Sequence, residues 1–205
     1  MKRLILFAGI LALFVSPRPV SAAPIVGQQL FASGGDVIAH FMGHTAGFTN
    51  ELYLFSASDL TTPLAVTATV GSLGAGQIFV NQTSPVGSQV NLGSFAAGTE
   101  LVFAIYVQDS DDLFFMGPGS RNPDGLAHGA VDNGLPPQFP SYGAIPAGFV
   151  GLGFEDIYGG GDLDYDDLGF AFSNVRVSQT PEPASIALLA LGVAALGARR
   201  MRRHV

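Results

Sequence analysis

"ELVFAIYV", residues 100–107, is the stretch that decides the fold of this chain. After one acid it is entirely apolar, and its Val, Phe, Ile and Tyr side chains are those that favour β-strands. Comparable runs recur at intervals of about 8 to 14 residues, with turn-forming Gly and Pro between them. They occupy residues 36–43, 51–57, 64–70, 76–81, 88–95, 112–117 and 148–154.

This succession of strands predicts an all-β fold. Between residues 23 and 177 no stretch shows a convincing 3.6-residue period, so no helix is expected between one strand and the next. Strands without intervening helices form antiparallel sheets that pack face to face or close into a barrel. We expect residues 23–177 to form a single domain, an antiparallel jelly-roll-like β-sandwich flanked by an N-terminal signal helix and a C-terminal hydrophobic sorting helix.

The N-terminal residues predict export. Two basic residues precede an apolar run over residues 4–15, and the small residues of "VSAAP" follow. This order is typical of a secretory signal peptide, here residues 1–22. The apolar run is shorter than the roughly 20 residues of a membrane span. We expect signal peptidase to cut after Ala22. A cut after Ala23 is disfavoured, because it would place Pro24 next to the scissile bond.

The C-terminal residues, 178–205, read as a linker, a turn, a helix and a basic tail. Pro181, Glu182 and Pro183 form the turn, an Ala/Leu-rich helical pattern follows over 185–198, and four arginines close the chain. Basic residues beside an apolar transmembrane helix keep that end on the cytoplasmic side of the membrane. A plain tail anchor is the alternative interpretation of the same pattern.

This three-part tail resembles the PEP-CTERM sorting signal of Gram-negative bacteria. The resemblance implies that the C-terminal helix holds the exported protein transiently in the inner membrane, as a transmembrane helix. It further implies that an exosortase cuts near the motif and that the protein is delivered to the cell surface or the extracellular matrix. Proteins with this signal are often associated with exopolysaccharide, which makes matrix components the expected partners.

The charge of the chain is unevenly distributed. Between Ala23 and Thr180 the only Lys or Arg residues are Arg121 and Arg176, whereas the same part contains fifteen Asp and Glu residues. This part therefore carries a formal charge of −13, although the whole chain carries −7. Nucleic acid is not an expected partner, because neutralising phosphates requires clustered Lys and Arg. Cations and neutral sugars suit such a surface. The chain has no cysteine, which excludes disulfides and thiolate metal sites.

Six carboxylates crowd the first thirteen positions of "EDIYGGGDLDYDDLGF", residues 155–170, without a Lys or Arg among them. Asp162, Asp164 and Asp166 alternate, so in an extended backbone they would project to one side. The same parity then brings apolar residues to the core. The two valines that follow Ser173 reverse the parity, which predicts a bulge or a strand break there.

This crowding predicts a bound cation. Like charges about 6 Å apart repel by roughly 3 kcal/mol per pair at an effective dielectric constant of 20, and a divalent ion reverses that sign. Ca²⁺ suits best, because it accepts six to eight oxygen ligands in flexible geometry, and the three glycines of the loop allow backbone carbonyls to approach it. The ligands that we expect first are Asp162, Asp164 and Asp166. Glu155, Asp156 and Asp167 follow in order of preference, and Asp124 and Asn122 come last.

Alternatives to this cation site remain open. The spacing Asp-x-Asp-x-Asp is similar to the start of an EF-hand loop, but Asp167 stands where that loop requires Gly and Ser173 where it requires Glu, so we reject an EF-hand. A solvated acidic turn is one alternative, and a pair of catalytic carboxylates is another.

A second polar stretch follows the strand of residues 100–107. Three aspartates come first, and then the turn signal "NPDG". Asn122, Asp124 and His128 could add ligands from this neighbouring loop. The alternatives are a turn without further function and a hydrogen-bonded structural histidine.

Three stretches in this order, "NLGSFAAGTELVFAIYV", "SRNPDGLAH" and "GFEDIYGGGDLDYDDLGFAF", form a wider pattern. It resembles a glycine- and aspartate-rich domain of unknown function found in exported bacterial proteins. Its signature is matched at Gly153 to Asp167, and the resemblance covers residues 91–177. It implies a β-rich extracellular module that binds Ca²⁺ and has no established enzymatic activity.

The expected function is that of an exported surface or matrix protein with a Ca²⁺-stabilised β-sandwich. The alternative is a carbohydrate-binding module or adhesin, with Tyr142, Tyr158 and Tyr165 as stacking residues. We do not expect an enzyme. A glycosidase needs two carboxylates about 5 to 9.5 Å apart across its substrate, and crowded acids that attract metals are poor general acids. His40 and His44 lack the Glu of a His-Glu-x-x-His zinc site.

Overall fold

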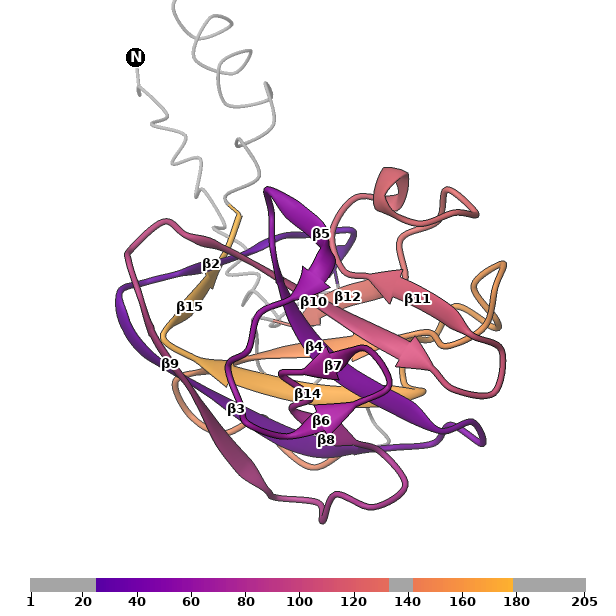
Figure 1. The fold of residues 1–205 in the computed structure, drawn as a ribbon, viewed down its shortest axis with the longest axis horizontal. Helices are drawn as coiled ribbons and strands as arrows, with labels where there is room; N and C mark the ends of the chain where they lie inside the picture. Colours follow the sequence, from indigo (N-terminus) through magenta and orange to yellow (C-terminus); the bar gives the residue numbers. More distant parts are fainter. Residues whose placement is uncertain (1–24, 133–141, 179–205) are drawn as a thin grey trace, which may run out of the picture.

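The computed structural model describes residues 25–132 and 142–178, which form two main antiparallel β-sheets that pack face to face (Figure 1). The all-β class and the antiparallel pairing expected from the sequence are thus confirmed. The predicted cleavage positions Ala22 and Ala23, the Pro181–Pro183 motif and both expected terminal helices lie outside the described residues. Within the described residues, no helix has the length and apolar character that crossing a membrane requires.

Strand β10 (Glu100–Val107) is the centre of the first sheet. Strand β4 (Asn50–Ser56) pairs with it along its length. The other edge of β10 is shared by β2 (Leu30–Ala32) at its start and by β11 (Asp112–Phe115) at its end. Because strands cover both of its edges and the second sheet packs against it, most of β10 is buried, as its apolar composition predicts.

The remaining strands complete the two sheets. The first sheet has the order β15–β2–β10–β4–β5, and its outer members are β15 (Val175–Val177), β5 (Asp59–Pro63) and β8 (Phe79–Val80), the last paired with β4. The second sheet has the order β1–β12–β13–β14–β3–β9. Its strands are β1 (Ile25–Val26), β12 (Gly129–Asp132), β13 (Phe149–Phe154), β14 (Leu168–Ser173), β3 (Gly35–His44) and β9 (Gln89–Phe95).

Within residues 25–132 and 142–178, a short hairpin and a 3₁₀ turn lie outside these two sheets. Strands β6 (Val70–Gly71) and β7 (Gly74–Ala75) pair with each other as a short hairpin. A single 3₁₀ turn, η1 (Gly119–Arg121), follows β11. Arg121 at its end donates to Glu100 over 2.7 Å and so ties the turn to the start of β10.

Aromatic rings join the two sheets. Phe103 of β10 and Phe172 of β14 stack with ring centroids 3.9 Å apart, and neither is exposed. Phe170 lies one pleat away and contacts the rings of Phe41, Phe79 and Phe154. Each large apolar side chain buried in this way contributes roughly 1.5–3 kcal/mol, so these rings contribute substantially to the packing of the two sheets.

The chain changes sheets after Ser173. Asn174 has a φ of 53°, a left-handed conformation that Asn tolerates better than most residues, and β15 then joins the other sheet. The Ser173 hydroxyl accepts from the Ile38 N–H over 3.0 Å, and the Asn174 amide donates to the Asp36 carbonyl over 2.6 Å. The strand break predicted at Ser173 is therefore confirmed.

The strand predicted over residues 64–70 is wrong. The Val66 N–H donates to the Leu64 carbonyl two residues earlier, which folds the chain into a tight turn. Gly76, with a φ of 103°, packs against that carbonyl so closely that a Cβ would come within 2.2 Å of it. Short pieces on either side, β5 and β8, pair with β4 instead.

Candidate cation site and its surroundings

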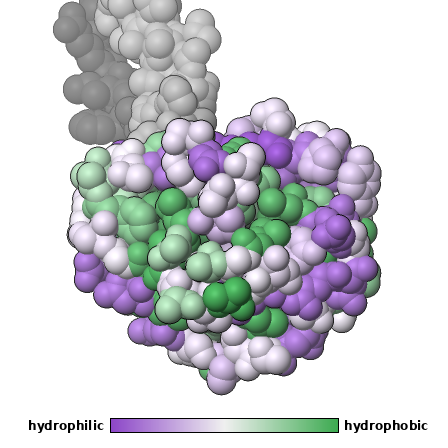
Figure 2. All heavy atoms as spheres, in the orientation of Figure 1, coloured by the Kyte–Doolittle hydropathy of each residue, from purple (hydrophilic) through white to green (hydrophobic). Residues whose placement is uncertain are grey.

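Several loops meet at one end of the sandwich. The β13–β14 loop, the β3–β4 loop and the loop after β10 gather on the right in Figure 1, and hydrophilic residues are prominent on that side in Figure 2. The N–H groups of Thr45 and Ala46 donate to the Asp167 carbonyl over 3.0 and 3.1 Å. The Thr49 N–H donates to the Asp109 carboxylate over 2.6 Å. These bonds fix the three loops against one another.

The acidic loop between β13 and β14 has an unusual backbone. All three of its consecutive glycines have positive φ, and so do Leu163 and Tyr165, at 63° and 58°. A non-glycine residue in this conformation costs roughly 1–2 kcal/mol, and such strain is characteristic of functional segments. The extended backbone expected for Asp162 to Asp166 is therefore wrong, because these two left-handed residues bend it.

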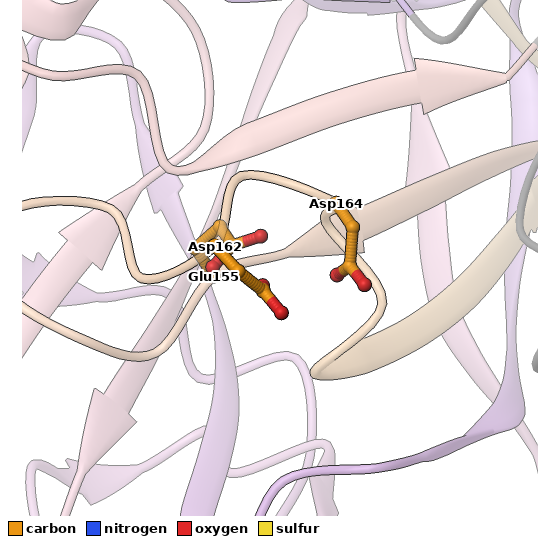
Figure 3. Close-up of side chains that lie close together, drawn as sticks. All are labelled: Glu155, Asp162 and Asp164. Atoms are coloured by element: carbon orange, nitrogen blue, oxygen red, sulfur yellow. The ribbon is translucent and has the colours of Figure 1, made fainter.

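The bend brings three carboxylates together. Glu155 comes from the end of β13, and Asp162 and Asp164 come from the far side of the loop; one oxygen from each lies within 4.8 Å of the others. In Figure 3 the Glu155 and Asp162 side chains overlap, and their carboxyl groups lie on the side that faces Asp164. Glu155 is only 1 % exposed, whereas the two aspartates are open to solvent. We call these three residues the carboxylate cluster.

Glu155 has one oxygen satisfied and one free. Its Oε1 accepts from the Tyr165 N–H over 2.5 Å. Its Oε2 is buried and has no hydrogen-bond partner among the residues that the structure describes. A buried carboxylate oxygen without a partner costs free energy, and here the neighbouring groups are further anions. A positive ion between the three carboxylates would satisfy this oxygen.

The electrostatics agree with this geometry. Burial raises the pKa of Glu155 to about 7; the Tyr165 N–H opposes this rise, and the charges of Asp167, Asp162 and Asp164 add to it. Burial also raises the pKa of Asp164, assisted by Asp166 and Asp162. The ionised cluster is thus unfavourable by itself, and a cation reverses that balance.

Gly161 leaves the space that the cluster requires. A Cβ at this position would lie 2.5 Å from Glu155 Oε2, closer than any real contact allows. Gly159, two residues earlier, has open space around its missing side chain. The glycine run therefore permits the turn of the backbone and leaves space beside Glu155 Oε2.

Three further acids predicted as ligands lie outside this cluster. The Asp166 carbonyl and Oδ1 accept from the Thr45 hydroxyl over 2.8 and 3.1 Å, which holds the β3–β4 loop. Asp156 is buried and accepts from the Asn50 amide over 2.7 Å. Asp167 accepts from the Asp156 N–H over 3.0 Å, and burial, with Asp156 beside it, raises the pKa of Asp167 to about 6.

Asp124, Asn122 and His128 hold the neighbouring loop in place. Asn122 is buried, accepts from the Phe115 N–H and donates to the carbonyls of Phe115 and Leu126. His128 is buried against the Phe114 ring, with Nε2 2.8 Å from Asp124 and Nδ1 3.0 Å from the Glu155 carbonyl. His128 links this neighbouring loop to the carboxylate cluster, because it contacts both Asp124 and the backbone of Glu155.

Asp124 also contacts the acidic loop itself. Its Oδ2 accepts from the Gly159 N–H over 2.9 Å. Desolvation would raise the pKa of Asp124, but the N–H groups of Gly159 and Leu126, together with His128, outweigh it and lower the pKa to about 2. The sequence contained a signal for this role, since Asp124 and His128 are four residues apart within one polar turn.

The tyrosine surface of the alternative, sugar-binding interpretation is contradicted for two of its three members. Tyr142 and Tyr165 are each 8 % exposed and pack together with Met42, Ala130 and Ala171. Tyr158 is exposed and remains accessible. The two buried rings support the acidic loop and are not available for stacking against a sugar.

Comparison with known proteins identifies the tail. The PEP-CTERM protein-sorting motif matches residues 179–203, which include Pro181, Glu182 and Pro183. The motif implies an exported protein that is held transiently at the membrane and processed by an exosortase. Searches of the curated proteins and of the solved structures found no match. The resemblance of residues 91–177 to a domain of unknown function stays a prediction.

Proposed function

We propose that this protein is a cell-surface or extracellular-matrix component whose β-sandwich is stabilised by Ca²⁺ bound at the carboxylate cluster. Export and processing by exosortase follow from the sorting motif. The observation that carries the metal assignment is the free, buried Oε2 of Glu155, which belongs to the same cluster as Asp162 and Asp164. A cation would give this oxygen the partner that it lacks and would offset the repulsion among the three carboxylates.

The donor set favours Ca²⁺ over other metals. All three side chains offer oxygen only, which is the ligand type of Ca²⁺ and Mg²⁺, whereas Zn²⁺ favours nitrogen and sulfur. Mg²⁺ requires strict octahedral geometry, but Ca²⁺ tolerates an irregular set completed by water and backbone carbonyls. Two of the three carboxylates are exposed, so water can supply the remaining ligands. Extracellular Ca²⁺ modules of this kind bind with Kd of about 10⁻⁴–10⁻³ M.

The ion would fasten the acidic loop to the sandwich. Glu155 directly follows β13, whereas Asp162 and Asp164 lie beyond the glycines, so one ion joins the two ends of the bend. This would stabilise Leu163 and Tyr165 in their strained conformation. The loop then presents a fixed surface to matrix polysaccharide or protein outside the cell.

Thermal unfolding of the full chain in mild detergent tests this proposal. We expect Ca²⁺ to raise the Tm relative to chelator, and Mg²⁺ to have little effect. Asp162→Asn and Asp164→Asn should each reduce the rise. Asp36→Asn is the matched control, because Asp36 is an exposed acid at the opposite end of β3 from the acidic loop. An equal Tm in Ca²⁺ and in chelator would overturn the proposal.

A further inference from the structure

A cavity separate from the carboxylate cluster opens beside it. Its volume is about 490 Å³, and the β3–β4 loop, the loop after β10 and the two ends of the acidic loop line it. This volume is within the range of small-molecule sites, roughly 300–1,000 Å³. None of the three cluster residues lines it.

One part of the cavity wall is anionic. Asp109, Asp156 and Asp167 all line it, and Asp156 is only 2 % exposed. No lysine occurs in the described residues, Arg121 pairs with Glu100, and Arg176 lies over the Phe31 ring, so no Lys or Arg in the described ranges lines this cavity. A buried carboxylate that faces a cavity without a cation nearby favours a positively charged ligand.

Another part of the wall is apolar. Phe48 is 39 % exposed and Ile157 is 46 % exposed, and both line the cavity with Ala46. Large apolar side chains of this kind commonly form the walls of ligand sites, while a few polar groups fix the orientation of the ligand. The Phe48 ring can also attract a cation through its π face.

A bare metal ion fits this cavity poorly. Among the described residues, the three carboxylates that line it do not form a set of ligand atoms within 4.8 Å of one another, as the carboxylate cluster does. The cavity is also much larger than a single ion, and its apolar wall offers no ligands to a metal. A ligand with a charged group and an apolar body matches both halves of the wall.

We propose that this cavity binds a small organic amine, with its ammonium group against the anionic wall formed by Asp109, Asp156 and Asp167 and its body against Phe48 and Ile157. The ammonium donates hydrogen bonds to one or two of these carboxylates and is attracted by the charge of the remaining ones, and the ring or chain that carries it displaces water from the apolar wall. An amino sugar and a simple cyclic amine both meet this description. The site is independent of the proposed Ca²⁺ site.

Calorimetric titration of the full chain, saturated with Ca²⁺ at neutral pH, tests the proposal. The probes are two matched pairs, glucosamine with glucose and cyclohexylamine with cyclohexanol, in which only the amine differs. We expect at least one amine to bind at least tenfold more tightly than its neutral partner. Equal affinity within both pairs, or no binding of either amine, would overturn the assignment.

Variants locate the site. Asp109→Asn and Phe48→Ala change exposed residues, and each should weaken amine binding at least fivefold without altering the Ca²⁺ response. Asp111→Asn, at an exposed acid that does not line the cavity, should leave amine binding unchanged. Glu155→Gln should abolish the Ca²⁺ response and preserve amine binding. Loss of amine binding in Glu155→Gln, with none in Asp109→Asn or Phe48→Ala, would place the amine at the carboxylate cluster and refute the proposal.

Discussion

Glu155 and Asp156 are adjacent in the chain, yet they belong to two different sites. Glu155 joins Asp162 and Asp164 in the carboxylate cluster, whereas Asp156 lines the cavity beside Asp167. Both are almost completely buried. One turn of the backbone after β13 therefore supplies a buried anion to each site, and the two can be separated by mutation.

Glu155→Gln should remove the Ca²⁺ response and at the same time stabilise the protein in chelator. The amide keeps the shape of the carboxylate but removes a buried charge. For the unmodified chain, Ca²⁺ at 100 times its Kd adds about 2.7 kcal/mol, a rise of roughly 5–10 °C in a domain of this size. Scanning calorimetry of both proteins checks this. A Ca²⁺-dependent rise that persists in Glu155→Gln would contradict the assignment.

Stability in chelator should fall as pH rises. The pKa values of Glu155 and Asp167 are raised to about 7 and about 6, in both cases chiefly by burial. The folded chain therefore holds these protons more tightly than the unfolded chain, so the stabilisation is complete below about pH 4 and is lost as pH rises through 6 and 7. Ca²⁺ should offset the loss, because it binds the ionised cluster.

Melting temperatures measured from pH 4 to pH 8, with chelator and with Ca²⁺, test this dependence. The gap between the two curves should widen toward neutral pH. A gap that narrows as pH rises would show that the ion does not bind ionised Glu155.

Gly161→Ala should impair Ca²⁺ binding more than Gly159→Ala. Both glycines have positive φ, so each substitution costs roughly 1–2 kcal/mol of backbone strain. Only at Gly161 would the new methyl group meet Glu155 Oε2, at 2.5 Å. We expect at least tenfold weaker Ca²⁺ binding in Gly161→Ala and a smaller change in Gly159→Ala. Equal losses in the two variants would mean that the loop, and not the space beside Oε2, determines affinity.

Asp124→Asn should destabilise the acidic loop, and the loss of stability should depend on pH. The pKa of Asp124 is lowered to about 2, because its N–H and His128 contacts outweigh desolvation. A lowered carboxyl pKa contributes stability that is present above about pH 4 and is lost as pH falls toward 2. We expect the variant to show a lower Tm at pH 5 and little difference at pH 2, measured by circular dichroism. An equal difference at both values would rule out this electrostatic role.

The main strands could be predicted from the sequence because their residues carry the signal themselves. Strands β3, β4, β9, β10, β11 and β13 coincide closely with apolar or alternating runs bounded by turns. Strands β1, β2 and β12 have two to four residues each and were not predicted. Such short segments become strands through their partners, which a single sequence does not reveal.

The sequence shows the charge of the acidic loop, but it does not predict the geometry of that loop. Which carboxylates converge depends on the left-handed residues Leu163 and Tyr165, and neither residue type signals that conformation. The loop therefore brings Asp162 and Asp164 to Glu155 and directs Asp166 to Thr45 instead. The sequence does not predict the cavity either, because three loops that are distant in the sequence form it.

Calorimetric titration of the chelator-treated full chain with CaCl₂ tests the central claim most directly. The carboxylate cluster predicts saturable binding of one Ca²⁺ per chain, with a Kd of about 10⁻⁴–10⁻³ M, that Glu155→Gln abolishes and Asp36→Asn preserves. The absence of saturable uptake by the unmodified protein, or uptake that Glu155→Gln leaves intact, would contradict it.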